Sequence, residues 1–235
     1  MRFFLLALAA LALTGCATTS VDMLKSGVTP QVAMLRDGSK VQYMEYIPPS
    51  YHGGKAPVLV FLHGSGEAGS DVTRVMGPGP WAYATSHPDF PFIILAPQQP
   101  RDEEWEPKRL KEWLDIAEAR IPADKHRIYL TGLSLGGGGA WAWGMHQPRR
   151  FAAIAPVSGY STAKTPCALK NNHIWAFHGD SDDVVPITDE RPLVDAAKIC
   201  GVDVTYTVYA DGNHNAWDAT YANPALYAWF LDHKN

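Results

Sequence analysis

The chain has 235 residues, of which 46% are hydrophobic and 19% are charged, and its formal net charge is −4. These values fit one ordinary globular domain with a sizeable core. The weak negative charge gives no reason to expect a nucleic-acid partner, and the sequence contains no internal repeat, low-complexity segment or acidic tail. Eight tryptophans and ten tyrosines fit a packed core and also a site that accommodates organic groups.

The first sixteen residues are typical of an export signal. Arg2 precedes an apolar run at 3–13, which is too short to span a bilayer as a helix but suits the apolar region of a secretory signal. The segment ends in LTGC, which resembles the lipobox of bacterial lipoproteins, where the cysteine is acylated and becomes the new N-terminus. We therefore expect residues 1–16 to be a signal peptide ending at a lipidated Cys16. A soluble secreted protein with a chance cysteine is the alternative.

The residue after the cysteine indicates a location. Lipoproteins retained in the inner membrane commonly carry aspartate there, whereas this chain has Ala17. In a bacterium with two membranes, the resemblance implies a lipid anchor at the outer membrane or on the periplasmic side, without a transmembrane span. Residues 17–30 are then expected to be a tether, and residues 31–235 one folded domain.

After the tether, apolar runs rich in branched residues alternate with helical patterns. The predicted strands lie at 41–47, 57–62, 92–96, 127–131, 151–157, 174–177 and 204–209. The predicted helices lie at 110–121, 138–146 and 189–199. This alternation predicts an α/β fold with a mostly parallel sheet covered by helices on both faces. In such sheets, functional residues gather at the carboxyl ends of the strands.

The segment TGLSLGGGGAW, residues 131–141, follows one of these strands. It is not a phosphate-binding loop of the Walker type, because Gly138 stands where lysine is required. The dinucleotide fingerprint G-x-G-x-x-G fails in every register. What fits is the nucleophile elbow G-x-S-x-G, in which a strained turn exposes a serine and tiny residues let strand and helix pack closely. The motif predicts Ser134 as a nucleophile; a glycine-rich turn with an idle serine is the alternative.

A serine hydroxyl is a weak nucleophile and needs a base, usually a histidine oriented by a carboxylate. Two later segments supply these groups in the required chain order. HGDSDDVVP follows a predicted strand and offers Asp180, Asp182 and Asp183, and ADGNHNAW follows the last strand and offers His214. We expect His214 to be the base and one of the three aspartates to be its partner.

An earlier strand ends in HGSG, residues 63–66. One backbone N–H from such a loop and the N–H after the nucleophile together form an oxyanion hole. The candidates are Ser65 and Leu135. His63 is expected to fix the loop rather than to move protons.

The length of one connection predicts an open cleft. Residues 158–173 separate the strand after the nucleophile helix from the strand before the acid, and these sixteen residues are too few for a helical cap. Trp217 is expected to line the substrate pocket, although a core role is the alternative. Trp81 and Gln98 are further pocket candidates.

Taken together, these motifs resemble the α/β-hydrolase superfamily, and within it the lidless carboxylesterase/phospholipase-type and polyhydroxybutyrate-depolymerase-like esterases. The similar segments are VFLHGSGEAGSD, RIYLTGLSLGGGGAW, FAAIAPVSG, WAFHGDSDDVVP and DGNHNAWDATYANPALYAWFL, and they cover most of residues 41–232. In the group's H-G-x-x-D-x-V-V-P pattern the catalytic acid is the fifth residue, which implies Asp182. Gly138 and Gly139 depart from the group, whose members often carry a larger residue there, so the width of the pocket beside Ser134 stays open.

The resemblance implies a monomeric serine carboxylesterase without metal or cofactor, acting on short-chain or polymer-borne esters such as acetyl or feruloyl esters. A small peptidase of the prolyl-oligopeptidase kind is one alternative, but such enzymes usually carry a propeller that the short stretch before residue 41 cannot form. A non-catalytic binding lipoprotein is another, although no member of the triad is missing.

Two further cysteines are expected to pair. The predicted helix at 189–199 returns from the carboxyl ends of the strands to their opposite ends, where Cys200 follows it and Cys167 precedes the strand at 174–177. Export to an oxidising compartment would permit a disulfide between Cys167 and Cys200. Two buried free thiols are the alternative.

Overall fold

A computed structural model describes residues 26–162 and 165–235. Within them, eight strands form one sheet in the order β1-β2-β4-β3-β5-β6-β7-β8. β2 pairs antiparallel with β1 and β4, and all the remaining neighbours are parallel. The strands are β1 (Gly27–Met34), β2 (Lys40–Ile47), β3 (Ala56–Leu62), β4 (Ile93–Pro97), β5 (Ala123–Leu133), β6 (Ala153–Val157), β7 (His173–Gly179) and β8 (Asp203–Tyr209).

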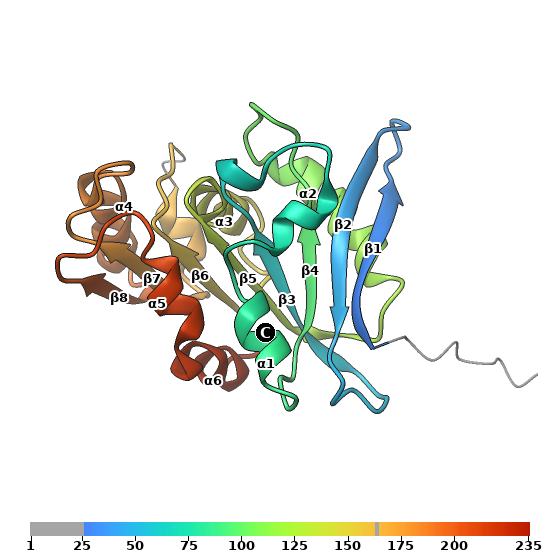
Figure 1. Ribbon diagram of the computed structural model, residues 1–235. Coiled ribbons are helices and arrows are strands. Elements are labelled where there is room, and N and C mark those ends of the chain that lie inside the picture. The colour runs from blue at the N-terminus through green and yellow to red at the C-terminus, as the bar shows by residue number, and fades with distance from the viewer. Residues whose placement is uncertain (1–25, 163–164) are drawn as a thin grey trace, which may run out of the picture.

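Helices cover both faces of this sheet (Figure 1). Within the described residues the α-helices are α1 (Trp81–Ser86), α2 (Pro107–Glu118), α3 (Leu135–His146), α4 (Ile187–Ile199), α5 (Trp217–Ala222) and α6 (Pro224–Asp232). Short 3-10 helices occur at η1 (Ser65–Glu67), η2 (Val72–Met76) and η3 (Pro166–Leu169). All seven predicted strands and all three predicted helices are present, with ends that differ by a few residues from the expected ones.

The alternation of side chains along the strands divides the core into two layers. In β3, Val58 and Val60 belong to the layer under α2, α3 and α4, whereas Leu59 and Phe61 belong to the layer under α1, α5 and α6. All four side chains are completely buried. A strand buried on both faces is apolar throughout, which is why these segments were visible as continuous apolar runs.

The N-terminal boundary differs from the expected one. β1 begins at Gly27 and pairs along its whole length with β2, so the last residues assigned to the tether belong to the sheet. β1 lies at the edge of the sheet and is mostly half-exposed, and it contains Pro30. Proline is tolerated in an edge strand because one side of that strand needs no ladder hydrogen bonds. The segment therefore lacks the apolar pattern of the inner strands.

The connection between β6 and β7 carries no helical cap within its described residues, which contain only η3. Here Cys167 and Cys200 form the expected disulfide, with 5.1 Å between their Cα atoms. It joins η3 to the end of α4.

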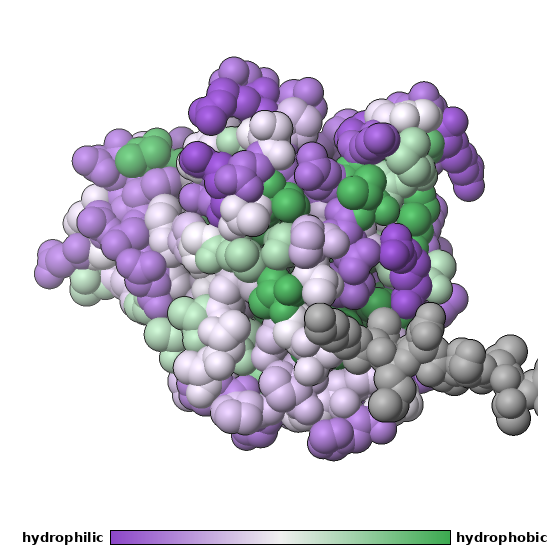
Figure 2. Space-filling model, turned by 45° about the vertical axis from the view of Figure 1, so that its right-hand side comes forward, coloured by the Kyte–Doolittle hydropathy of each residue, from purple (hydrophilic) through white to green (hydrophobic). Residues whose placement is uncertain are grey.

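The described surface is mixed in character. Figure 2 shows hydrophobic side chains dispersed among hydrophilic ones on the face in view. In the stretches 26–162 and 165–235, none of the helices has the length and apolar character needed to cross a bilayer. The expected signal peptide, Cys16 and most of the expected tether lie outside the described residues.

Candidate active site

The expected elbow lies between β5 and α3. Ser134 has φ 52° and ψ −119°, a left-handed conformation that is strained for a serine. A Cβ on Gly132 would come within 2.3 Å of the Gly136 carbonyl oxygen, and one on Gly136 within 2.0 Å of the Leu62 carbonyl oxygen. Only glycine permits this approach of strand and helix. The turn leaves Ser134 partly exposed at the carboxyl end of β5.

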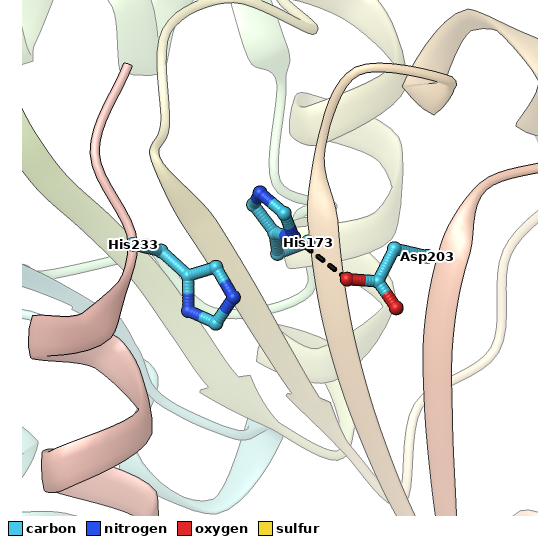
Figure 3. A group of neighbouring side chains, drawn as sticks. All are labelled: His173, Asp203 and His233. Carbon is cyan, nitrogen blue, oxygen red and sulfur yellow. Dashed lines mark hydrogen bonds and ion pairs between the residues drawn. The ribbon is translucent and has the colours of Figure 1, made fainter.

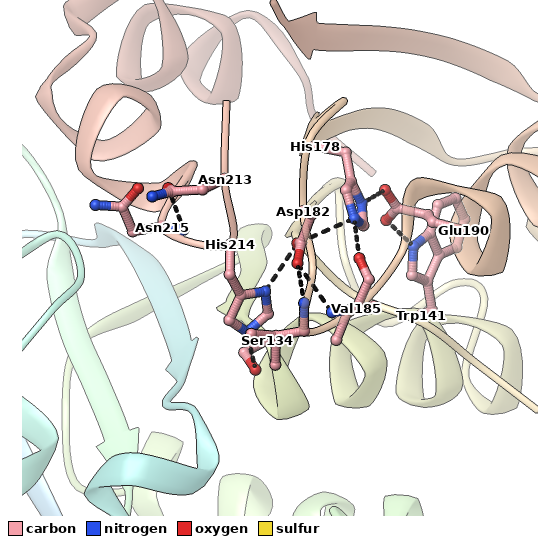
Figure 4. A network of polar contacts seen from close by, with 10 residues as sticks. Ser134, Trp141, His178, Asp182, Val185, Glu190, Asn213, His214 and Asn215 are labelled. Atoms are coloured by element: carbon pink, nitrogen blue, oxygen red, sulfur yellow. Dashed lines mark hydrogen bonds and ion pairs between the residues drawn. The ribbon is translucent and has the colours of Figure 1, made fainter. Parts of the chain in front are cut away.

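Ser134, His214 and Asp182 lie in one hydrogen-bonded line, although they come from distant parts of the chain (Figure 4). His214 Nε2 is 2.9 Å from Ser134 Oγ, and His214 Nδ1 is 2.8 Å from Asp182 Oδ2. An ionised carboxylate only accepts, so Nδ1 carries the hydrogen and Nε2 faces the serine hydroxyl as an acceptor. This is the arrangement that lets a histidine take the proton of a serine.

The structure also separates the three aspartates that spacing left open. The Asp182 side chain is fully buried, and its Oδ1 accepts hydrogen bonds from the backbone N–H groups of Val184 and Val185 at 3.0 and 2.9 Å. These bonds fix the carboxylate so that Oδ2 faces His214. Asp180 and Asp183 are exposed. Geometry therefore favours Asp182, as the family pattern implied.

The loop after β3 lies against the nucleophile. A Cβ added to Gly64 would lie 3.5 Å from Ser134 Cβ. The Gly64 N–H donates to Glu67 Oε2 at 3.0 Å, and this bond holds the short helix η1 that begins at Ser65. Ser65 and Leu135 border the same surface hollow, of about 420 Å³. Both oxyanion-hole candidates thus line one hollow, and Leu135 directly follows the nucleophile.

His63 fixes this loop, as expected. Its Nε2 accepts the Gln99 N–H at 3.0 Å, so its Nδ1 carries the hydrogen and donates to the Gly64 carbonyl at 2.7 Å. Trp105 packs edge-on against the ring. Burial lowers the pKa of His63 to about 4, so the ring is neutral near pH 7. A neutral histidine with both nitrogens bonded to the backbone is a structural element rather than a proton carrier.

A second hollow, of about 630 Å³, is lined by residues that include Tyr83, Trp217 and Tyr221. Trp217 also packs edge-on against His214, with 5.0 Å between the ring centroids. Trp217 therefore lies where a pocket wall was expected. Tyr83 comes from α1, the helix that follows the loop beside Ser65.

The expectation for the other two pocket candidates is wrong. Trp81 is buried in the core against Phe61, and its Nε1–H donates to the Val75 carbonyl at 2.7 Å. Gln98 is buried behind the loop, where its Nε2 donates to the Glu67 carbonyl at 2.8 Å, and it borders neither of the two hollows. The N–H groups of Trp81 and Gln98 thus support neighbouring backbone carbonyls.

The two extra glycines of α3 do not widen the pocket. A Cβ on Gly138 would meet the Tyr160 carbonyl oxygen at 2.4 Å, and one on Gly139 would meet the Trp105 ring at 2.7 Å. Neighbouring parts of the chain thus occupy the space that a larger residue would fill.

One group of possible metal ligands occurs in the described residues, away from the serine. His173, Asp203 and His233 bring ligand atoms within 4.8 Å of one another (Figure 3). His173 and Asp203 begin β7 and β8, so they lie at the opposite ends of the strands from the triad. His173 Nδ1 is 2.7 Å from Asp203 Oδ2, and His233 Nδ1 donates to the Trp229 carbonyl. A cross-strand polar pair with the His233 ring tilted against His173 accounts for this arrangement.

The sheet order, the elbow and the Ser-His-Asp line together define an α/β-hydrolase. Comparison with known families then places the chain more narrowly. Residues 36–199 match the family model Esterase, described as "Putative esterase", and the chain belongs to this family.

Solved structures agree with the fold. A thermostable esterase is 30% identical with a TM-score of 0.76, covering 88% of this chain and 63% of that one. A ferulic acid esterase is 19% identical with a TM-score of 0.69, covering 87% and 96%. A fluorophosphonate-binding serine hydrolase of Staphylococcus aureus is 14% identical with a TM-score of 0.70, covering 87% and 98%.

The curated relative is a more limited match. Serine carboxypeptidase-like 27 of Arabidopsis thaliana is 42% identical over 53 residues, which is 23% of this chain and 12% of that protein. The chain thus spans less than two thirds of both this relative and the thermostable esterase.

The geometry predicts a ranking among substitutions at the site. Ser134→Ala should lower kcat by several orders of magnitude and leave the fold intact. Asp182→Asn should lower it by about 10³–10⁴, because the histidine loses its orienting partner. Asp180→Asn and Asp183→Asn are the matched controls and should have small effects. Steady-state ester hydrolysis checks this, and a larger loss at Asp183 than at Asp182 would overturn the assignment.

His63 predicts a pH dependence of stability. Its pKa in the folded chain lies below the ordinary value of 6.5, so protonation favours the unfolded chain. Neutral His63 contributes its full share of the free energy of unfolding above about pH 6.5. As the pH falls toward 4, at most about 3 kcal/mol of this contribution is lost. The difference in the free energy of unfolding between the wild type and His63→Gln, measured with urea, should therefore be smaller at pH 4 than at pH 7. Parallel stability curves for the two proteins would contradict it.

Proposed function

We propose that the protein is a serine carboxylesterase that works through an acyl-enzyme. The observation that carries this proposal is the hydrogen-bonded line from Ser134 through His214 to Asp182 at the end of a nucleophile elbow. Membership in the Esterase family supports ester rather than amide chemistry.

In the proposed reaction, Ser134 Oγ attacks the ester carbonyl carbon while His214 Nε2 takes the hydroxyl proton. Asp182 accepts the Nδ1–H bond and stabilises the imidazolium that forms. The N–H groups of Ser65 and Leu135 would stabilise the negative oxygen of the tetrahedral intermediate. His214 then protonates the leaving alcohol, and a water molecule activated by the same histidine releases the acid.

Two hollows border residues that adjoin the triad, Trp217 in one and Leu135 in the other, and their chemistry supports a class of substrate. The hollow that Trp217 lines has the half-buried indole of this residue in its wall, and Trp217 also contacts His214. On the side of Ser65 and Leu135, the wall is charged and consists of Arg101, Asp102, Glu103 and Glu104. An aromatic wall stacks on flat groups, whereas carboxylates accept hydrogen bonds from hydroxyl groups.

This pairing favours a small or aromatic ester carried by a hydroxyl-rich group, as in acetyl or feruloyl esters of a polymer. The proteins with similar folds include a ferulic acid esterase, which is consistent with this choice. Both hollows are partly open to solvent, so a long acyl chain would stay partly exposed and gain only part of the about 0.8 kcal/mol that each fully buried CH₂ contributes.

A panel of p-nitrophenyl esters from C2 to C16, together with methyl ferulate, tests the substrate class. We expect kcat/KM to be highest at C2–C6, with hydrolysis of methyl ferulate and no activation by micelles. Labelling by a fluorophosphonate probe should occur in the wild type and be lost in Ser134→Ala. A preference that rises to C12 and beyond, or faster cleavage of a peptide substrate, would refute the assignment.

The location is a separate proposal. We infer from the sequence alone that Cys16 is lipidated and holds the protein at the outer membrane. Mass spectrometry of the mature protein from its native host should find a diacylated or triacylated cysteine at the N-terminus. An unmodified N-terminus in a protein recovered from the soluble fraction would refute the anchor.

A further inference from the structure

A second buried pair of ionisable side chains lies directly behind the acid of the triad. His178 is the second-last residue of strand β7, just before the loop that carries Asp182, and Glu190 is in the first turn of α4. Both side chains are fully buried, and His178 Nδ1 is 2.8 Å from Glu190 Oε2. Burying two such groups is costly, and the chain keeps them beside the site (Figure 4).

The partners of His178 define where its hydrogens are. Nε2 is 2.8 Å from the Val185 carbonyl oxygen, which can only accept, so Nε2 carries a hydrogen. The same nitrogen is 3.3 Å from Asp182 Oδ2. His178 therefore presents one N–H to both the Val185 carbonyl and the oxygen of Asp182 that faces His214.

Glu190 is the hydrogen-bond partner of His178 Nδ1. Its Oε1 accepts the Trp141 Nε1–H at 2.8 Å, so its Oε2 remains for His178. Burial lowers the pKa of His178, but the hydrogen bond and charge of Glu190 outweigh this and raise it. Burial raises the pKa of Glu190, and His178 opposes that rise. Both nitrogens of His178 face acceptors, the Val185 carbonyl and Glu190 Oε2, and one proton between Nδ1 and Oε2 leaves the pair neutral as a whole with its His178 end nearer Asp182.

Few other charged side chains lie near enough to His178 to take over the role of Glu190. Among the described residues, Tyr206 of β8 faces Glu190, and the Glu190 charge and burial both raise the pKa of its hydroxyl. Arg191 on α4 lies over the Tyr206 ring, 5.6 Å from its centroid. Trp141 belongs to α3, the helix that begins directly after Ser134. Glu190 thus connects the nucleophile's helix, the acid loop and α4.

We propose that His178 and Glu190 are positioning residues for Asp182. Glu190 holds the proton on His178, and His178 holds the acid loop and the Asp182 carboxylate in the orientation that His214 requires. The inference rests on the proposed serine-hydrolase function, because it assigns the pair a role within that site. Neither residue touches the substrate, so their effect should fall on kcat.

Glu190→Gln is the first test, since it keeps the size of the side chain and removes its charge. We expect kcat to fall about tenfold to a hundredfold, as happens when outer partners of functional histidines are lost, with KM nearly unchanged. The acidic limb of the kcat/KM profile should move to higher pH, because the positive end of the pair beside the triad is lost.

Glu118→Gln is the matched control. Glu118 is another buried carboxylate, paired with Arg150, and it lies at the end of α2 away from the triad. This variant should lose stability while keeping the wild-type kcat and pH profile. The double variant His178→Gln/Glu190→Gln should lose less than the product of the two single losses, because the two residues act as a unit.

Trp141→Phe keeps the inference testable if Glu190→Gln does not fold. It removes the N–H that Glu190 Oε1 accepts, together with part of a buried ring, and leaves Glu190 itself in place. It should move the acidic limb in the same direction with a smaller loss of kcat. The positioning role of His178 and Glu190 is refuted if Glu190→Gln has the same kcat and pH profile as Glu118→Gln. If Glu190→Gln does not fold, the same comparison is made with Trp141→Phe.

The rate of fluorophosphonate labelling separates this inference from the proposed function. A wild type that is labelled but hydrolyses no ester of the panel would refute the ester assignment. The labelling rates of the variants would still test the positioning role of His178 and Glu190. A wild type that is not labelled refutes both. Equal labelling rates in the wild type and Glu190→Gln would overturn only the role of the pair.

Discussion

The close approach of two backbones at the elbow is the constraint on which the site depends. Because Gly132 and Gly136 carry no side chain, β5 and α3 meet almost in contact, and Ser134 is forced into a left-handed turn. Strain of this kind persists only where the surrounding packing holds it. The central position of β5, between β3 and β6, provides that packing. The serine therefore stands clear of both elements with its hydroxyl available.

The other functional groups reach the serine because parallel strands end at the same edge of the sheet. β7 and β8 are paired along their length, from His173 opposite Asp203 to Gly179 opposite Tyr209. The loops after these two strands carry Asp182 and His214, so the register of the ladder decides how far apart the acid and base lie. Helices on both faces hold the strands, and the site itself needs only short loops.

The sequence predicted the inner strands, the elbow and the order of the triad because each leaves a local pattern. β1 has none, since an edge strand with Pro30 need not be apolar. The pocket residues were harder to predict. The amino-acid sequence does not distinguish a buried tryptophan such as Trp81 from one that lines a hollow, such as Trp217. Glu190 was missed for a similar reason. An acidic residue in the first turn of a helix is ordinary on any surface, and only the fold shows that this one is buried.

The disulfide encloses more of the site than its position suggests. The bond between Cys167 and Cys200 closes a covalent ring that contains β7, the acid loop and α4. Asp183 and Val184 are exposed within that ring, at a loop where a protease could cut. A chain severed there would remain one molecule, with its two fragments joined through sulfur until a reductant released them. The acid of the triad would thus stay tethered to both halves of the fold after a single cleavage.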